Sequence, residues 1–170
     1  MTRRLPLRAA ILLGALAMGV PSAARAQVCN ATNDPSLAIA RTADLQFGDL
    51  GATPSAGTAV IDAATGGRTV TGGVVAAGAL FNAGAFDVLL CGPAGPKRFD
   101  VILPAGSVTL AGPGGATMTV DTFTASPKTS NVSGSTSSVT TITVGGTLRV
   151  GANQAPGAYT GTFTVIVARQ

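Results

Sequence analysis

Two stretches near the C-terminus, 141–150 and 158–168, alternate between apolar and polar residues. In the first, the even positions are apolar or small and the odd positions are mostly polar. In the second, the odd positions from Tyr159 to Val167 are apolar or small, and most even positions are threonine. Period-2 alternation with β-branched and aromatic residues predicts half-buried strands. Glycine, proline and asparagine between the two stretches favour a turn. The pattern therefore predicts two long strands joined by a turn.

Shorter alternating segments upstream predict further strands. They lie at 37–41, 44–48, 58–62, 68–74, 85–91, 98–104, 107–110 and 117–123. The pair Gly72 and Gly73 predicts a bulge or bend, and Phe123 breaks the phase set by Met118 and Val120. About nine short strands with turns every 8–12 residues predict an all-β sandwich.

Two segments lack this alternation and are predicted to be loops. One is 51–57, which contains Pro54. The other is 126–138, which is almost wholly Ser, Thr, Gly, Pro and Asn, and which we predict to be exposed and mobile.

The first 26 residues have the pattern of a secretory signal peptide, with a basic start, an apolar run over 9–20 and small residues at Ala24 and Ala26. The run is too short and too rich in Gly and Ala for a membrane span. We therefore expect residues 1–26 to be removed, leaving 27–170 as one domain without a membrane span. The expected location is the periplasm, the cell surface or the extracellular space. Both the general and the twin-arginine export routes stay open.

Removal of the leader changes the charge. The whole chain has 11 basic and 7 acidic residues, a formal net charge of +4. Four of the basic residues, all arginines, lie in the leader, so the mature chain has seven charges of each sign. The basic balance of the full sequence therefore gives no reason to expect a nucleic acid or an anionic membrane as partner.

Cys29 and Cys91 are the two cysteines of the chain. In an exported protein the expectation is one disulfide between them. It would close a loop of about 63 residues and contribute roughly 4 kcal/mol on the chain-entropy estimate.

The residue types exclude several kinds of chemistry. The chain has no histidine, so neither a Ser-His-Asp triad nor a Cys-His nucleophile is possible. Zinc would have two cysteines at most, and no calcium loop occurs. We expect no catalytic residues, metal or cofactor. A hydrolase would need two of the seven scattered aspartates to meet in space, which the sequence cannot show.

Six segments together resemble one family: 44–48, 57–62, 99–104, 118–123, 144–150 and 151–165. The most specific is Ala-Asn-Gln at 152–154, followed by Gly-x-Tyr-x-Gly-x-Phe-x-Val at 157–165. They resemble the secreted bacterial family called domain of unknown function 4402, which is regarded as pilin-like. The resemblance covers nearly all of the mature chain.

The resemblance implies an incomplete immunoglobulin-like sandwich that lacks its last strand and leaves a hydrophobic groove. In such subunits a strand of a periplasmic chaperone fills the groove first. The N-terminal extension of the next subunit then replaces it at an outer-membrane usher, which is donor-strand complementation. The implied function is a non-enzymatic structural or adhesive surface subunit. The residues expected to line the groove are Ile142, Val144, Leu148, Val150, Tyr159, Phe163, Val165 and Val167. The same residues also fit an ordinary sandwich core.

Two alternatives stay open. A polymerising subunit needs an apolar N-terminal donor segment, but only Gln27 and Val28 precede Cys29, and 29–35 is polar. The chain could therefore be a tip or capping subunit, which accepts a strand and donates none. It could instead be a self-complete secreted binding domain, for example for carbohydrate, with the loop 126–138 as its contact surface.

Overall fold

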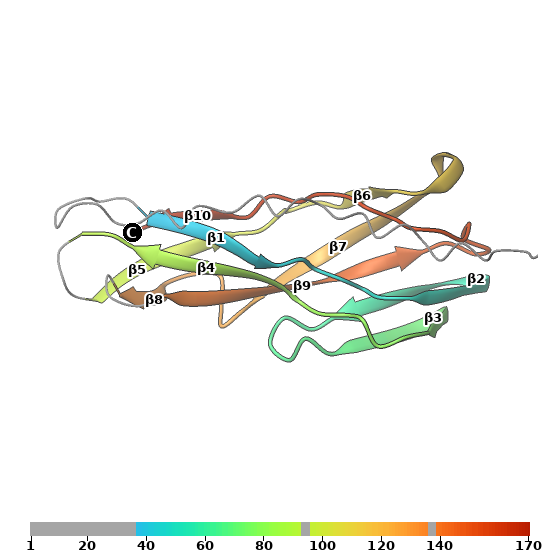
Figure 1. The fold of residues 1–170 in the computed structure, drawn as a ribbon, viewed down its shortest axis with the longest axis horizontal. Coiled ribbons are helices and arrows are strands. Elements are labelled where there is room, and N and C mark those ends of the chain that lie inside the picture. Colours follow the sequence, from blue (N-terminus) through green and yellow to red (C-terminus); the bar gives the residue numbers. More distant parts are fainter. Residues whose placement is uncertain (1–36, 93–95, 136–138) are drawn as a thin grey trace, which may run out of the picture.

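The computed structural model describes residues 37–92, 96–135 and 139–170, in which ten strands form two antiparallel sheets (Figure 1). The first sheet contains β1 (Leu37–Ala43), β2 (Leu50–Ile61), β3 (Arg68–Ala76), β4 (Gly84–Leu90), β6 (Val108–Ala111), β7 (Thr117–Ser126) and β9 (Thr140–Val150). The second contains β5 (Pro96–Ile102), β8 (Val132–Ser135) and β10 (Ile166–Arg169). The predicted all-β sandwich is confirmed.

Strand β9 organises the first sheet, whose order is β1-β4-β9-β2-β3. The two neighbours β4 and β2 share one edge of β9, because β4 pairs with residues 140–144 and β2 with 146–150. On its other edge β9 pairs with β7, which pairs with β6. Gly145 lies at the junction of β4 and β2, where a Cβ atom would collide with the carbonyl oxygen of Ile61. A glycine is therefore needed for β2 to end so close to β9.

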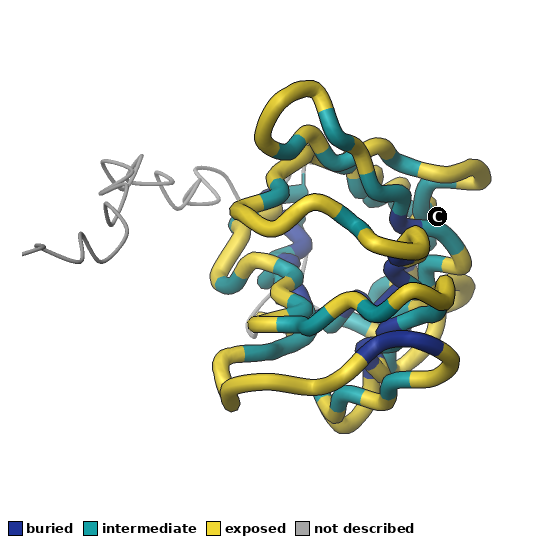
Figure 2. Tube along the Cα trace, turned by 90° about the vertical axis from the view of Figure 1, so that its right-hand side faces the viewer, coloured by how far each residue is buried: buried dark blue, intermediate teal, exposed yellow. Residues whose placement is uncertain are grey.

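The core follows the alternation of the strands. One buried cluster combines β4, β5, β8 and β9 and includes Val88, Phe99 and Ile142. A second lies between β2, β3, β7 and β9 and includes Ala59, Val120 and Leu148. The even positions of β9 from Ile142 to Val150 are all buried, as predicted. Seen along the long axis of the molecule, exposed residues occupy much of the perimeter and buried residues form short stretches of chain (Figure 2).

The predicted bulge at the glycine pair is confirmed, but the predicted loop at 51–57 is wrong. Residues 50–61 form the single strand β2, whose register with β3 shifts between Ala52 and Gly57. Gly72 has φ 65°, and a Cβ at Gly73 would collide with the carbonyl oxygen of Ser55. The bulge absorbs Pro54 without ending the strand, which is how a sheet accommodates a proline.

Two other local predictions need correction. Segment 44–48 is not a strand and makes only an isolated bridge, Gln46 with Asn82, among the described residues. The predicted mobile loop 126–138 contains strand β8, and Val132 of β8 is 1% exposed and pairs with Phe99. A single buried valine and pairing with β5 outweigh the polar composition of this segment, as tertiary contacts override local propensity. Residues 136–138 lie outside the described ranges.

The C-terminal strand is shorter than the alternation predicts, since β10 covers only 166–169. The amide of Gln170 donates to the carbonyl of Arg98 at 3.0 Å, and Ile166 pairs with Ile102 in the same phase. In an antiparallel ladder the next bonded pair would be Thr164 with Pro104. Because proline has no amide hydrogen, the ladder ends there. Nor do the two predicted C-terminal strands lie side by side, since β9 and β10 belong to different sheets.

Three aspartates support turns and strand pairs. The Asp62 carboxylate accepts bonds from the backbone amide and hydroxyl of Thr65, which lower its pKa below the ordinary value of 3.8. The backbone amide of Asn131 and the side chain of Gln170 lower the pKa of Asp100, and a hydrogen bond from Arg149 lowers that of Asp121. Each bond favours the ionised carboxylate of the folded state.

Acid should therefore destabilise the domain. Because the folded-state pKa values are lowered, the unfolded chain binds more protons near pH 3.8, and the stabilisation present above that pH is lost as the pH falls through the folded values. We expect the urea midpoint of the wild type to be lower at pH values below 3.8 than at neutral pH. The decrease should be smaller in Asp100→Asn. A midpoint that does not change with pH in either protein would contradict this.

Candidate functional site

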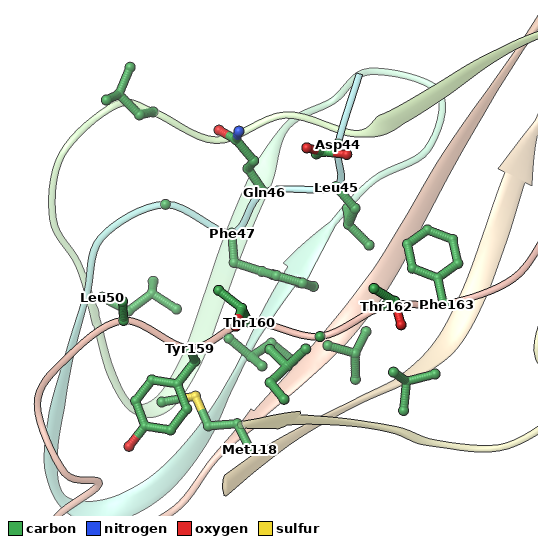
Figure 3. Close-up of a pocket in the computed structure, with 18 of the residues that line it drawn as sticks. Asp44, Leu45, Gln46, Phe47, Leu50, Met118, Tyr159, Thr160, Thr162 and Phe163 are labelled. Carbon is green, nitrogen blue, oxygen red and sulfur yellow. The ribbon is translucent and has the colours of Figure 1, made fainter. Parts of the chain in front are cut away.

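A cleft of about 750 Å³ opens between two segments that lie far apart in the sequence. One wall is residues 41–50, which lead from β1 into β2, and we call it the first wall. The other is residues 157–163, which precede β10, and we call it the second wall (Figure 3). The floor is apolar and comes from β4, β6, β7 and β9. Its residues are Phe86, Val108, Leu110, Met118, Val120, Phe123 and Leu148.

The first wall points alternate side chains towards the cleft. Ala43, Leu45 and Phe47 are half-buried, whereas Asp44 and Gln46 are exposed. Figure 3 shows Leu45 and Phe47 extending from this wall towards the second wall. Gln46 exchanges two backbone bonds with Asn82, at 2.9 and 3.0 Å. In this geometry the backbone groups of Leu45 point to the opposite edge, and among the described residues they have no hydrogen-bond partner.

The second wall also has an unpaired edge. Thr160 exchanges two backbone bonds with Ala111, and β10 pairs with β5 further on. Between these two points, residues 161–165 make no backbone hydrogen bond within the described chain. Strand β10 itself has β5 as its partner on one edge and no described strand on the other. The cleft thus separates two stretches of extended chain, each of which has one edge without a hydrogen-bonded neighbour in the described chain.

Ile39 of β1 is a further inward-facing side chain that stays accessible. It pairs in register with Val88, so the two side chains point to the same face of the sheet. Val88 is 1% exposed, but Ile39 is 42% exposed. An inward-facing isoleucine stays accessible because β1 is an edge strand, with β4 as its partner on one side only in the described chain.

Tyr159 is fixed at one end of the cleft. Its hydroxyl donates to the carbonyl of Ala155 at 2.7 Å and accepts a bond from Gln154 Nε2 at 2.8 Å. Its ring lies against the backbone of Gly112, where any Cβ atom would collide with ring carbons. The tyrosine therefore presents a rigid apolar ring to the cleft while its polar tip is satisfied in the turn.

Phe163 lies at the other end of the second wall, within a group of three aromatic rings. Its ring centroid is 5.2 Å from that of Phe123 and 6.4 Å from that of Phe86. Phe123 reaches this place through a bulge, since the register of β7 with β9 shifts between Asp121 and Thr124, and Thr122 has φ 50°. The bulge explains why Phe123 breaks the sequence alternation.

The residues predicted to line a groove divide into three groups. Leu148, Tyr159 and Phe163 line the cleft. Ile142, Val144 and Val150 are sandwich core, with exposures of 1%, 0% and 4%. Val165 and Val167 are half-buried and pack against the cluster that contains Phe99.

Sequence reasoning missed the first wall and most of the floor. The sequence shows that Leu45 and Phe47, like Met118 and Val120, are separated by one polar residue, which marks these side chains as inward-facing. It does not show that the face they share lies open, because this depends on which strand has no neighbour.

The predicted disulfide cannot be placed, since Cys29 lies outside the described residues. Cys91 follows β4 and is buried, and its carbonyl oxygen accepts a bond from Arg169 Nη1 at 2.7 Å. The pairing of the two cysteines stays a prediction. The predicted signal peptide, 1–26, also lies outside the described residues.

The family model described as "Domain of unknown function (DUF4402)" matches residues 37–168. The chain belongs to this family. The DUF4402 match begins at the first residue of β1 and ends within β10, so it includes both walls and the floor of the cleft. No curated protein and no solved structure matches the chain.

Two further findings concern the described part of this DUF4402 chain. No group of three or more His, Cys, Asp or Glu side chains is placed to hold a metal ion there. Among the same residues, no helix is both long enough and apolar enough to span a membrane.

Proposed function

We propose that the protein is an exported, non-enzymatic surface subunit of pilin-like type whose cleft receives a β-strand from another chain. One observation carries the proposal. The cleft lies between two extended segments, each of which has one edge without strand partners in the described chain, and has a floor of seven apolar side chains. An inserted strand would pair with both edges and cover the floor at the same time. This is strand addition, in which backbone bonds give affinity and alternate side chains give specificity.

The expected occupant is an extended segment with alternating apolar side chains. Tyr159 and Phe163 mark the two ends of the second wall, and Gly161 between them has no side chain. Alternate residues of an inserted strand would point down to Leu110, Met118 and the other floor residues. The polar residues between them would face water, as Thr160 and Thr162 of the second wall do.

The occupant should come from a different protein, such as a periplasmic chaperone or another subunit delivered by an outer-membrane usher. The segment 29–35 of this chain is polar and offers no alternating apolar residues. A Cys29–Cys91 disulfide, which we also propose, would tether it to its own domain. A tip or capping subunit fits this combination, since it accepts a strand without donating one.

A strand peptide should stabilise the domain. The protein, exported to a bacterial periplasm and purified oxidised, is unfolded in urea with and without a peptide of about nine residues that alternates threonine with valine or leucine. If the peptide binds only the folded state, a free peptide concentration of about a hundred times Kd raises the free energy of unfolding by about 2.7 kcal/mol.

The control peptide has serine in place of each apolar residue and should leave the midpoint unchanged. A stable monomer whose midpoint ignores both peptides would show that the sandwich is complete. The self-complete secreted binding domain would then replace the strand-accepting subunit.

A further inference from the structure

Arg68 of β3 joins two segments that form the edge of the cleft. Its Nη1 donates to the carbonyl oxygens of Phe47 at 2.8 Å and Asp49 at 3.1 Å, both in the first wall. Its Nη2 donates to the carbonyl oxygens of Ala77 at 3.3 Å and Gly78 at 2.9 Å, in the loop before β4. One guanidinium thus satisfies four backbone acceptors from two separate segments.

The surroundings of Arg68 are fitted to this side chain. The guanidinium carbon lies 4.5 Å from the ring centroid of Phe81. At Gly48, which has φ 71°, a Cβ atom would come within 2.8 Å of Arg68 Nη1 and 2.6 Å of the Leu80 carbonyl oxygen. The first wall therefore bends at a glycine so that its carbonyls approach the arginine closely.

A lysine could not make the same set of contacts. Its ammonium is a single point of charge, whereas the planar guanidinium directs separate nitrogens to separate segments and stacks on an aromatic ring. The arginine is thus a fixed link between the β2–β3 hairpin, the first wall and the loop that carries Leu80, which is 77% exposed at the edge of the cleft.

We propose that Arg68 is a positioning residue that holds the first wall in the extended form that a binding strand pairs with. This inference rests on the proposed strand-accepting function. Segment 44–49 is not part of a strand. Within the described chain, its other hydrogen-bonded backbone groups are those of Gln46, which pairs with the backbone of Asn82, and the carbonyls of Asp44 and Asp49, which accept from Asn82 Nδ2 and from the amide of Ala77. Without Arg68 the carbonyl of Phe47 loses its partner. An incoming strand would then have to order the wall as it binds, which lowers affinity.

The test measures peptide affinity together with amide hydrogen exchange in the first wall and far from it. The affinity for a fluorescent peptide of about nine alternating Thr and Val or Leu residues is measured for the wild type, Arg68→Met, Arg68→Lys and Arg149→Met. Arg149 is the matched control, because it makes two hydrogen bonds to Asp121 away from the cleft. Amide hydrogen exchange at 45–50 is measured in the same proteins.

The methionine variant should bind the peptide about tenfold more weakly than the wild type, the lysine variant should be intermediate, and Arg149→Met should be unchanged. Exchange at 45–50 should be faster in Arg68→Met but unchanged at 140–144, where β9 pairs with β4. If the methionine variant does not fold, the lysine variant decides by the same two measurements.

Equal affinity in all four proteins would overturn the role of Arg68 and leave the strand-accepting cleft standing. Unchanged exchange at 45–50 would overturn it as well, even if affinity falls. A wild type that binds no peptide would refute the proposed function, and the positioning role would fall with it.

Discussion

Alanine in place of Phe99 is expected to lower the free energy of unfolding by about 3–5 kcal/mol, the usual loss for a large buried aromatic side chain. Phe99 is 0% exposed and stands at the centre of the second sheet, where it pairs with Arg169 of β10 and Val132 of β8. Its side chain packs in the cluster with Val88, Leu90 and Ile142 of the first sheet. The loss is a large part of the stability of a typical domain.

The matched control is Ile102→Ala on the same strand. Ile102 is 51% exposed and points away from the sandwich, so its truncation should cost less than about 1 kcal/mol. Urea unfolding of both variants measures the difference. If the two midpoints fell equally, β5 would not have one face buried and one exposed, and the sandwich would be assembled differently.

A strand added to the C-terminus should fill the cleft of its own domain. Strand β10 ends at Arg169, and its second edge has no described partner. A two-residue Asn-Gly turn after Gln170 would return the chain antiparallel to β10. A following strand of about nine alternating Thr and Val or Leu residues is long enough to run back towards Tyr159.

Tethering makes this binding intramolecular, with an effective concentration in the millimolar range. For an intrinsic Kd of about 10 μM, the free energy of unfolding should rise by about 3 kcal/mol. The extended protein should also ignore the free peptide, because its cleft is occupied. Both effects are read from urea midpoints with and without peptide.

The control is an extension of equal length with serine at each apolar position. The protein that carries it should have the same urea midpoint as the wild type and should respond to the free peptide as the wild type does. If the alternating and serine extensions gave the same midpoint, the cleft would not be a strand acceptor. If the alternating extension instead produced dimers, the strand would be reaching the cleft of a second copy, which is the exchanged form of the same contact.

The two unpaired edges explain why such a domain would need a partner. Exposed strand edges and an apolar floor favour association with other chains. The described chain has polar side chains along the outer face of the second wall, but the floor residues stay apolar. A protein that needed no partner would gain stability by closing this cleft or by making its floor polar.

The sequence by itself determined the class of fold and most strands, because each strand records its two faces in a period-2 pattern. The alternation of β9 marks its buried side, and the glycine pair at 72–73 marks the bulge. These signals are local, since neighbouring side chains on a strand point in opposite directions whatever lies beside them. Tyr159 and Phe163 could be named as groove residues for the same reason, together with the resemblance of the C-terminal pattern.

Only the tertiary structure decided which strands are neighbours, and therefore where the cleft lies. The alternation at 158–168 does not show that pairing stops opposite Pro104, which follows β5 and has no amide hydrogen to donate. Nor does the pattern of 44–48 show that its inward face is left open, or that Arg68 from β3 holds its carbonyls. Side-chain patterns fix the face that a residue occupies, whereas strand pairing depends on hydrogen bonds between segments far apart in the chain.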